Sequence, residues 1–463
     1  GTGTGQDFSN ISFTGGSVYL YSNALDVDND MLLNTGTLET EGQAVTVGGR
    51  ADIVSGTFTG TSGATTLGSL AVSSGATYQT TSAVTTITAS SGTCWDNNGT
   101  ISLDSGPVIF SGGCNINTGG TAEANDFNDL NFTGGTSTLV SNNLNVLGGM
   151  DVYGGSLDAN GQAINVLGTV FIDDNTLTGG TADHSFGVLY ILSGGIYSAT
   201  TGVTEINSSN VYNQVILLSS TGLITPNTGT FKIVSPGIER EIAPSTTGIN
   251  FYNLDVNTTD LVVDTSGTPY LNIANDLNVT SGIFNTSYDD VYLNVTGDTI
   301  IANGATFIGY TYDQWFGSLT IESGGTYEAS SATTTITSET AGGRAINNSG
   351  ILTANSGTFN ITTSGNTVIE NETTGSGNLY NLVVDKTNEL YTPSGMIIDN
   401  NLTVDAGVVY PQSNSWVWTG TGDVIINNGG TIGNGGLSGA ASFGSLTINT
   451  GGTYSATSGT TTL

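Results

Sequence analysis

The sequence contains very few positively charged residues. Lysine and arginine together number 5 among 463 residues, against 38 aspartates and glutamates, and the formal net charge is −33. Nucleic acids and anionic lipid surfaces are negatively charged and attract clusters of Lys and Arg. The composition therefore predicts no binding to nucleic acid and no attachment to a membrane surface. No stretch is long and apolar enough to be inserted into a membrane as a helix.

Residue types that favour helices and catalysis are also scarce. Only 9% of the residues are charged, and the chain has one histidine and two cysteines. Runs rich in Ala, Glu, Lys or Leu, which favour helices, are almost absent. Hydrophobic residues nevertheless make up 37% of the chain, and many are β-branched or aromatic, which suits strands better than disorder. The sequence predicts an ordered all-β protein.

One motif occurs four times with the same internal spacing. It contains a glycine, a leucine two residues later, a tyrosine after eight more residues and an aliphatic residue nine positions beyond the tyrosine. The motif divides the chain into large units of approximately 1–87, 88–206, 207–336 and 337–463. The motif tyrosines and the closing residues are Tyr78 with Ile87, Tyr197 with Ile206, Tyr327 with Ile336, and Tyr454 with Leu463.

A shorter period of 20 residues lies inside the large units. Inward-type residues recur at this step in several rows, and short strand-like runs recur about every seven residues. The clearest rows are Val27, Val47, Leu67 and Ile87; Val18, Leu38, Phe58 and Tyr78; Val146, Val166, Phe186 and Ile206; and Leu157, Leu177 and Tyr197.

This fixed step distinguishes a solenoid from a β-sandwich, whose strands keep no constant register along the chain. We predict one continuous β-solenoid over 1–463, with coils of about 20 residues and three short strands per coil. The chain would then form about 23 coils, and each large unit about six.

The two cysteines are one coil apart. Cys94 and Cys114 are separated by 20 residues, and equivalent positions of stacked strands lie about 4.8 Å apart, within the Cα range of a disulfide. We predict a disulfide between adjacent coils, with two free buried thiols as the alternative. An oxidised pair indicates an extracellular or periplasmic setting.

The strongest metal-like pattern is a run of alternating aspartates. Asp26, Asp28 and Asp30 could surround a calcium ion, but the glycine and distal glutamate of a calcium loop are missing. A solvated acidic edge is the favoured alternative. We expect no cofactor, and calcium is the one exception that the sequence leaves open.

Catalytic patterns are weak. His184 is flanked by Asp183 and Ser185, but neighbouring residues on a strand point to opposite faces and do not form a relay. Nominal acids for glycoside hydrolysis are Asp173-Asp174 and Asp289-Asp290. The five basic residues are scattered along the chain. We predict that the protein is not an enzyme.

Two aromatic groups could contact glycans, because exposed rings stack on sugars. Trp416 and Trp418 are expected on one face of a strand, and Tyr310, Tyr312 and Trp315 form a second group. Packing in the core or anchoring of loops is the favoured alternative for both groups.

Phrases such as Gly324-Gly325-Thr326-Tyr327 and the segment 401–407 resemble repeats of bacterial and archaeal surface proteins. These include filamentous-haemagglutinin-like adhesins and autotransporter-like passengers, and the resemblance implies a right-handed β-helix at the cell surface or outside the cell. We expect a non-catalytic shaft of an adhesin, or a subunit of a self-assembling filament or sheath. A carbohydrate-binding or carbohydrate-active β-helix is the alternative.

The expected partners follow from this interpretation. The chain starts part-way through a large unit, stops at the closing residue Leu463, and has no evident cap at either end. Bare solenoid ends expose strand edges. We therefore expect end-to-end self-association or continuation into a flanking solenoid of the same polypeptide, with surface glycans as further candidate partners.

Overall fold

The computed structural model describes residues 6–119, 126–208, 214–244, 248–263, 270–286, 291–371, 378–392, 397–411, 418–419, 422–433, 441–456 and 459–463. The chain divides into two compact units, residues 1–230 (unit 1) and 231–463 (unit 2). The described residues contain β-strands and no helix.

The strands of unit 1 are β1 (Gln6–Phe8), β2 (Ile11–Tyr19), β3 (Leu25–Val27), β4 (Met31–Glu39), β5 (Val45–Ile53), β6 (Thr57–Thr59), β7 (Thr65–Val72), β8 (Thr77–Gln79), β9 (Thr85–Ile87), β10 (Thr93–Asn97), β11 (Thr100–Ser102), β12 (Val108–Phe110), β13 (Asn115–Asn117), β14 (Leu130–Phe132), β15 (Gly135–Leu139), β16 (Leu144–Val146), β17 (Met150–Tyr153), β18 (Gly155–Asp158), β19 (Ile164–Asp173), β20 (Thr176–Thr178), β21 (His184–Ile191), β22 (Ile196–Ser198), β23 (Val203–Ile206), β24 (Gln214–Leu218) and β25 (Leu223–Thr225).

The next strand, β26 (Thr230–Ala243), begins at the last residue of unit 1. The strands that follow are β27 (Ile249–Phe251), β28 (Asn253–Val263), β29 (Tyr270–Ile273), β30 (Leu277–Asn285), β31 (Tyr292–Ile301), β32 (Ala305–Ile308), β33 (Gln314–Ile321), β34 (Thr326–Glu328), β35 (Thr333–Ile336), β36 (Arg344–Asn348), β37 (Ile351–Thr353), β38 (Thr358–Ile361), β39 (Thr367–Asn371), β40 (Asn381–Thr392), β41 (Leu402–Pro411), β42 (Trp418–Thr419), β43 (Asp423–Ile426), β44 (Gly430–Ile432), β45 (Ala441–Ser442), β46 (Ser445–Ile448), β47 (Thr453–Tyr454) and β48 (Thr461–Thr462).

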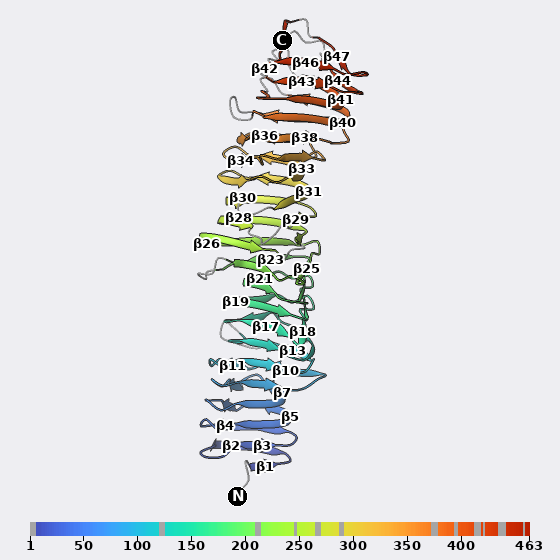
Figure 1. The fold of residues 1–463 in the computed structure, drawn as a ribbon. Coiled ribbons are helices and arrows are strands. Elements are labelled where there is room, and N and C mark those ends of the chain that lie inside the picture. Colours follow the sequence, from blue (N-terminus) through green and yellow to red (C-terminus); the bar gives the residue numbers. More distant parts are fainter. Residues whose placement is uncertain are drawn as a thin grey trace. The chain divides into compact units, whose positions relative to one another are not determined.

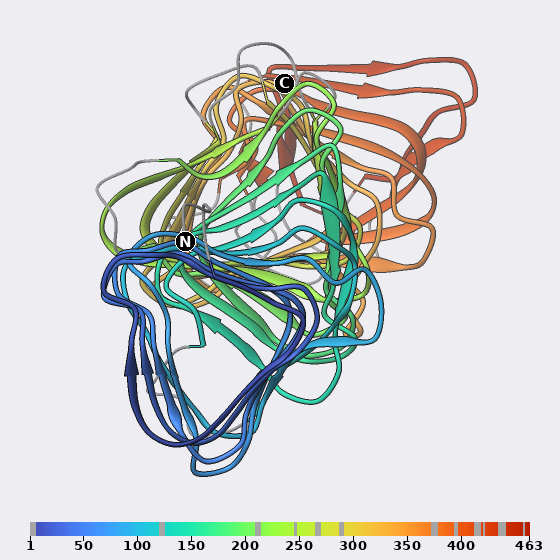
Figure 2. The ribbon, with the colours of Figure 1, turned by 90° about the horizontal axis from the view of Figure 1, so that it is seen from below.

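Each unit is a parallel β-solenoid, as the 20-residue period predicted. In each pairing for which the register is described, a strand pairs in parallel with the strand one turn before or after it, so that the strands are stacked within a unit (Figure 1). Viewed along the stack, the turns of unit 1, coloured blue to green, are three-sided loops (Figure 2). The described part of the chain forms about 18 turns of about 22 residues each. The expected coil of about 20 residues is confirmed, and the turns are fewer than the expected 23 because several turns contain longer connections.

The predicted rows of inward residues form columns, in which each residue is the Cα partner of the equivalent residue in the next turn. Val27, Val47 and Leu67 are successive Cα partners, and Ile87 follows them. All of these side chains are fully buried. Because strands stack in register, each inward side chain covers its equivalent in the next turn, and such burial contributes about 1.5–3 kcal/mol per aliphatic residue.

The large repeat is not a whole number of turns long. Equivalent residues of successive large repeats therefore lie one strand position apart within the turn. The column that contains Ile87 continues through Phe110, Phe132, Val152 and Ile172 to Ile191. The sequence equivalent of Ile87 is Ile206, which lies in a different column with Phe186. The expected figure of about six coils per large unit is close, but the unit is not a whole number of turns, because five turns lead from Ile87 to Ile191 and Ile206 follows before the sixth is complete. Turns after Ile87 are lengthened, since Thr85 pairs with Val108 and Val108 with Leu130.

The same offset occurs in unit 2. The column of Ile336 runs through Ile361, Val384, Val404 and Ile426 to Ile448. The sequence equivalent of Ile336 is Leu463, which follows β48, and β48 pairs with β45 instead. In each unit, equivalent segments of two successive large repeats thus occupy different sides of the turn.

Asparagine and aspartate side chains connect the corners of successive turns. The Asn10 Oδ1 accepts the main-chain N–H of Asp30 at 3.0 Å, and the Asp30 Oδ1 accepts that of Arg50 at 2.8 Å. Gly49 is required beside this corner, because a Cβ there would collide with the Asp30 carboxylate. These bonds satisfy main-chain donors that leave the strand ladder at a corner. The same succession occurs in unit 2 at Asn253, Asp276 and Asp298.

Each motif tyrosine contacts a threonine seven residues later. The Tyr197 hydroxyl lies 2.8 Å from the Thr204 hydroxyl, and both residues are buried. A buried phenol needs a hydrogen-bond partner. Burial also raises the pKa of Tyr78 to about 12, so that the hydroxyl keeps its proton. The other three pairs are Tyr78 with Thr85 at 3.2 Å, Tyr327 with Thr334 at 3.3 Å and Tyr454 with Thr461 at 3.1 Å.

A disulfide joins adjacent turns of unit 1. Cys94 is bonded to Cys114, and their Cα atoms are 5.8 Å apart. Cys94 occupies a bulge in β10, where the register to β13 shifts by one residue. The neighbouring Trp95 is buried against Phe127, with ring centroids 5.0 Å apart. The bond therefore fastens the lengthened turns in which the 20-residue step is lost.

The tyrosine–threonine pairs can be tested by a double-mutant cycle. We expect Thr204→Val to lower the free energy of unfolding by about 1–3 kcal/mol, because it removes the hydroxyl partner of a buried phenol. The double variant, which carries Thr204→Val and Tyr197→Phe, should lose less free energy of unfolding than the sum of the losses in the two single variants. Denaturant unfolding measures both, with Thr178→Val on the outward side of β20 as a nearly neutral control. Full additivity would contradict the coupling.

Candidate functional site

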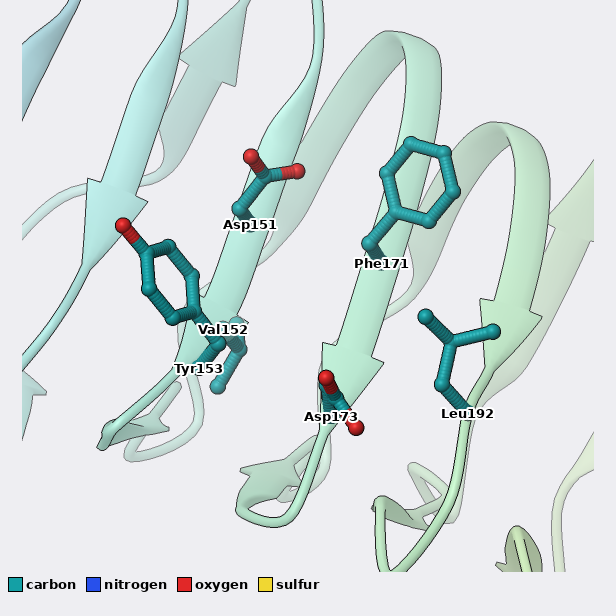
Figure 3. A pocket seen from close by; sticks show the side chains of 6 residues that line it. All are labelled: Asp151, Val152, Tyr153, Phe171, Asp173 and Leu192. Carbon is teal, nitrogen blue, oxygen red and sulfur yellow. The ribbon is translucent and has the colours of Figure 1, made fainter.

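A shallow pocket of about 240 Å³ lies on the outward face of unit 1. Strand β17 contributes Asp151 and Tyr153, the next strand, β19, contributes Phe171 and Asp173, and Leu192 follows β21 (Figure 3). Asp151 is the Cα partner of Phe171, and Tyr153 is the Cα partner of Asp173. An acid and a ring therefore face each other at both ends of the paired segment.

Strand alternation explains why these side chains point outward. Val152 and Ile172 are fully buried and carry the inward column, so their neighbours on each strand face solvent. The side chain of Tyr153 is 47% exposed and that of Phe171 is 36% exposed. Because these two partly exposed rings lie together with two carboxylates in a hollow of the surface, this pocket is the leading candidate for binding.

The rings of this face leave surface available for a ligand. Phe171 and Tyr190 meet edge to face, with centroids 5.4 Å apart and planes inclined by 72°. An edge-to-face contact leaves at least one face of each ring uncovered by the other ring. The arrangement can stack on a flat apolar or cationic group, while carboxylates beside it accept hydrogen bonds.

The carboxylates of the pocket lack an internal counter-charge. Partial burial and the nearby charge of Asp129 raise the pKa of Asp151. Within the described residues, no side chain donates a hydrogen bond to the carboxylate of Asp151 or of Asp173, although the Asn175 amide donates to the main-chain oxygen of Asp173. The sequence of unit 1 contains a single Lys or Arg, Arg50. This guanidinium is bound to Asp52 at 2.5 Å.

The three aspartates considered for calcium are not gathered into one group in the structure. Among the residues that the structure describes, no three His, Cys, Asp or Glu side chains are grouped so that they could hold a metal ion. Asp26, Asp28 and Asp30 are all exposed. Asp30 is one of the corner side chains that bind the next turn, and this is a structural role.

His184 is a core residue and takes no part in the pocket. It is 2% exposed, its Nδ1 accepts the main-chain N–H of Ile164 at 3.0 Å, and its Nε2 donates to the carbonyl oxygen of Gly179 at 2.7 Å. Asp183 accepts the N–H of Val203 at a corner. Burial lowers the pKa of His184. The imidazole is therefore neutral and fully used by main-chain groups.

Two basic residues of unit 2 are also committed to structural contacts. Lys386 is 3% exposed and donates to the carbonyl oxygens of Gly365 and Glu389, both at 2.7 Å. Burial lowers the pKa of Lys386 to about 8. Arg344 is paired with Glu370.

The structure describes the two aromatic groups noted in the sequence to different extents. Trp416 lies outside the described residues, and only the strand position of Trp418 in β42 is described. In unit 2, Tyr292 contacts Tyr312 and Trp315 and is stacked on Tyr270 at 5.2 Å. Tyr312 and Trp315 remain partly exposed, and Tyr270 is 50% exposed. Tyr310 is 54% exposed.

Comparison with known proteins gives no family. A scan against protein-family models, a search of curated proteins and a search of solved structures each found no match. The described residues also form no helix capable of crossing a lipid bilayer.

Sequence reasoning found Asp173 but missed the rest of the pocket. The signal was present in the residues next to the inward column, where Asp151, Phe171 and Tyr190 occupy one outward row. Further toward the N-terminus, the same row contains Asp26 and three threonines. A change from small polar residues to rings in an outward row could have identified the site.

The structural role of His184 predicts a specific pH dependence. A lowered folded-state pKa means that the contribution of neutral His184 is present above its unfolded pKa and is lost as the pH falls. Gln314, at the equivalent position in the next large repeat, binds Tyr327 at 2.5 Å. We therefore expect His184→Gln to gain stability relative to the wild type between about pH 7 and about pH 5, in denaturant unfolding. A pH-independent difference would refute this.

Proposed function

We propose that the protein is a non-catalytic structural protein of the cell exterior, either the shaft of a surface adhesin or the subunit of an extracellular filament or sheath. The observation that carries the proposal is the repetition of the same contacts from turn to turn. Inward columns and corner bonds such as Asn10 to Asp30 connect neighbouring turns, and the tyrosine–threonine pair that joins consecutive strands within a turn occurs four times. Such an array can be lengthened without any new kind of interaction.

The proposed location rests on two further observations. The disulfide between Cys94 and Cys114 is typical of proteins exposed to oxidising surroundings. The strand-and-turn phrases resemble those of filamentous-haemagglutinin-like and autotransporter-like surface proteins. The strongly negative charge and the scarcity of Lys and Arg also favour a soluble, protease-resistant exterior surface.

Self-association is the proposed mode of assembly. The contact between turns is head to tail, because each strand pairs in parallel with its equivalent. A heterologous contact of this kind produces an open fibre when it is repeated between molecules. Pairing with a flanking solenoid of the same polypeptide uses the same geometry.

Negative-stain electron microscopy over a range of concentrations tests the assembly. We expect continuous fibres with a regular axial repeat, which become shorter and fewer on dilution because strand pairing between molecules is reversible. Discrete particles with the mass of one chain at every concentration would contradict self-assembly and leave the shaft of an adhesin. Light scattering on the same samples measures the mass.

A second candidate function is carbohydrate binding, which the outward pocket favours. Rings with an uncovered face beside carboxylate acceptors are the groups that hold sugars, because one stacks on the ring and the other binds hydroxyls. Phe171 and Asp151 face each other across paired strands in this way.

We expect Phe171→Ala to weaken binding to any glycan that the protein captures from a panel of neutral, acidic and basic oligosaccharides. Loss of one stacking ring should reduce the affinity about tenfold. Tyr21→Ala, which removes an exposed ring elsewhere in unit 1, is the matched control and should have no effect. Equal losses in both variants, or no captured glycan, would contradict carbohydrate binding at the pocket.

A further inference from the structure

We infer that the outward pocket of unit 1 binds a positively charged aminohexose unit of a glycan, with the sugar ring on Phe171, the ammonium group at the neighbouring Asp151, and Asp173 adding negative charge at the other end of the pocket. This inference deepens the second candidate function and rests on it. It is independent of whether the chain assembles into fibres.

The charge of the pocket selects a cation. Asp151 and Asp173 lie on neighbouring strands, and Asp129 adds a third negative charge close to Asp151. The one Lys or Arg of unit 1, Arg50, is already bound to Asp52. An ammonium group placed beside Asp151 donates charge-assisted hydrogen bonds to its carboxylate and offsets the negative charge of Asp129 nearby. A neutral or acidic sugar gains neither benefit.

The aromatic rings of the pocket favour a ligand that has a flat apolar face next to its positive charge. Tyr153 and Phe171 occupy opposite corners of the grid that they form with the two acids (Figure 3). A cation over an aromatic face is attracted by the negative potential of the ring. The apolar face of a pyranose stacks on the same surface. One aminohexose can therefore contact an aromatic ring and a carboxylate of the pocket at the same time.

The size of the pocket favours a sugar over a lysine side chain. A hollow of about 240 Å³ accommodates a six-membered ring with its substituents. A single alkyl chain with a terminal ammonium group would leave much of the pocket to water and would cover little of either ring. The open outward position also allows the rest of a polymer to continue along the face.

Calorimetric titration with a glucosamine tetramer tests the inference. The N-acetylated tetramer, which has the same rings without the positive charges, and tetralysine, which has the charges without the rings, are the comparison ligands. Because the whole chain is strongly acidic, the titrations are made at about 0.15 M salt, where remote charges are screened. We expect the glucosamine tetramer to bind more tightly than either comparison ligand.

Matched variants separate the pocket from the general charge. We expect Asp151→Asn combined with Asp173→Asn to weaken binding at least about tenfold, because hydrogen bonds to a charged group are lost. Asp26→Asn combined with Asp28→Asn removes the same charge at exposed positions of unit 1 and should leave binding unchanged. Circular dichroism and unfolding curves verify that all variants are folded.

The outcomes distinguish this inference from the function on which it rests. Equal binding of the N-acetylated tetramer, abolished by Phe171→Ala, would overturn the choice of a charged sugar and retain carbohydrate binding. Tighter binding of tetralysine, or equal losses in the two aspartate pairs, would overturn the inference in favour of a protein partner or of unspecific charge. If neither tetramer binds, carbohydrate binding at the pocket fails as well.

Discussion

Parallel hydrogen bonding between successive turns is the constraint on which the structure depends. It holds equivalent residues of neighbouring turns about 4.8 Å apart, so every side chain must tolerate a near copy of itself on each side. Aliphatic and aromatic residues satisfy this requirement inside a turn, as in the column from Val27 to Ile191. Charged residues do not, because like charges stacked at that distance repel each other. The small proportion of charged residues is consistent with this geometry.

The same constraint decides how buried polar groups are placed. A phenol in the interior cannot reach water, and the strand that follows supplies a threonine hydroxyl to it, as Thr204 does for Tyr197. His184 fits the same environment only as a neutral imidazole with both nitrogens bound to main-chain groups. Residues that would suggest chemistry in another fold are here used to complete the hydrogen bonding of the core.

Outward positions are free of this packing requirement, which makes them the part of the surface that can specialise. Where the outward row contains threonines next to Val47 and Leu67, the face is small and polar. Where it contains Asp151 and Phe171, on strands that are paired in parallel like the others, the face has a pocket. The offset between the large repeat and the turns places equivalent segments on different sides, so repeated sequence does not produce a repeated surface. A binding site can therefore arise in one copy alone.

The sequence by itself determined the all-β class, the stacking of turns and the inward columns, because these follow from a step of 20 residues. It also predicted the disulfide between Cys94 and Cys114, although the register beside the bulge at Cys94 is 21 or 22 residues. It also placed Asp173 among the candidates. The tertiary structure alone decided the phase of Ile87 relative to Ile206, because the lengthened turns near Phe110 shift the columns by one strand. It alone decided the pocket, because the pairing of Asp151 with Phe171 depends on the register between strands and not on either strand by itself.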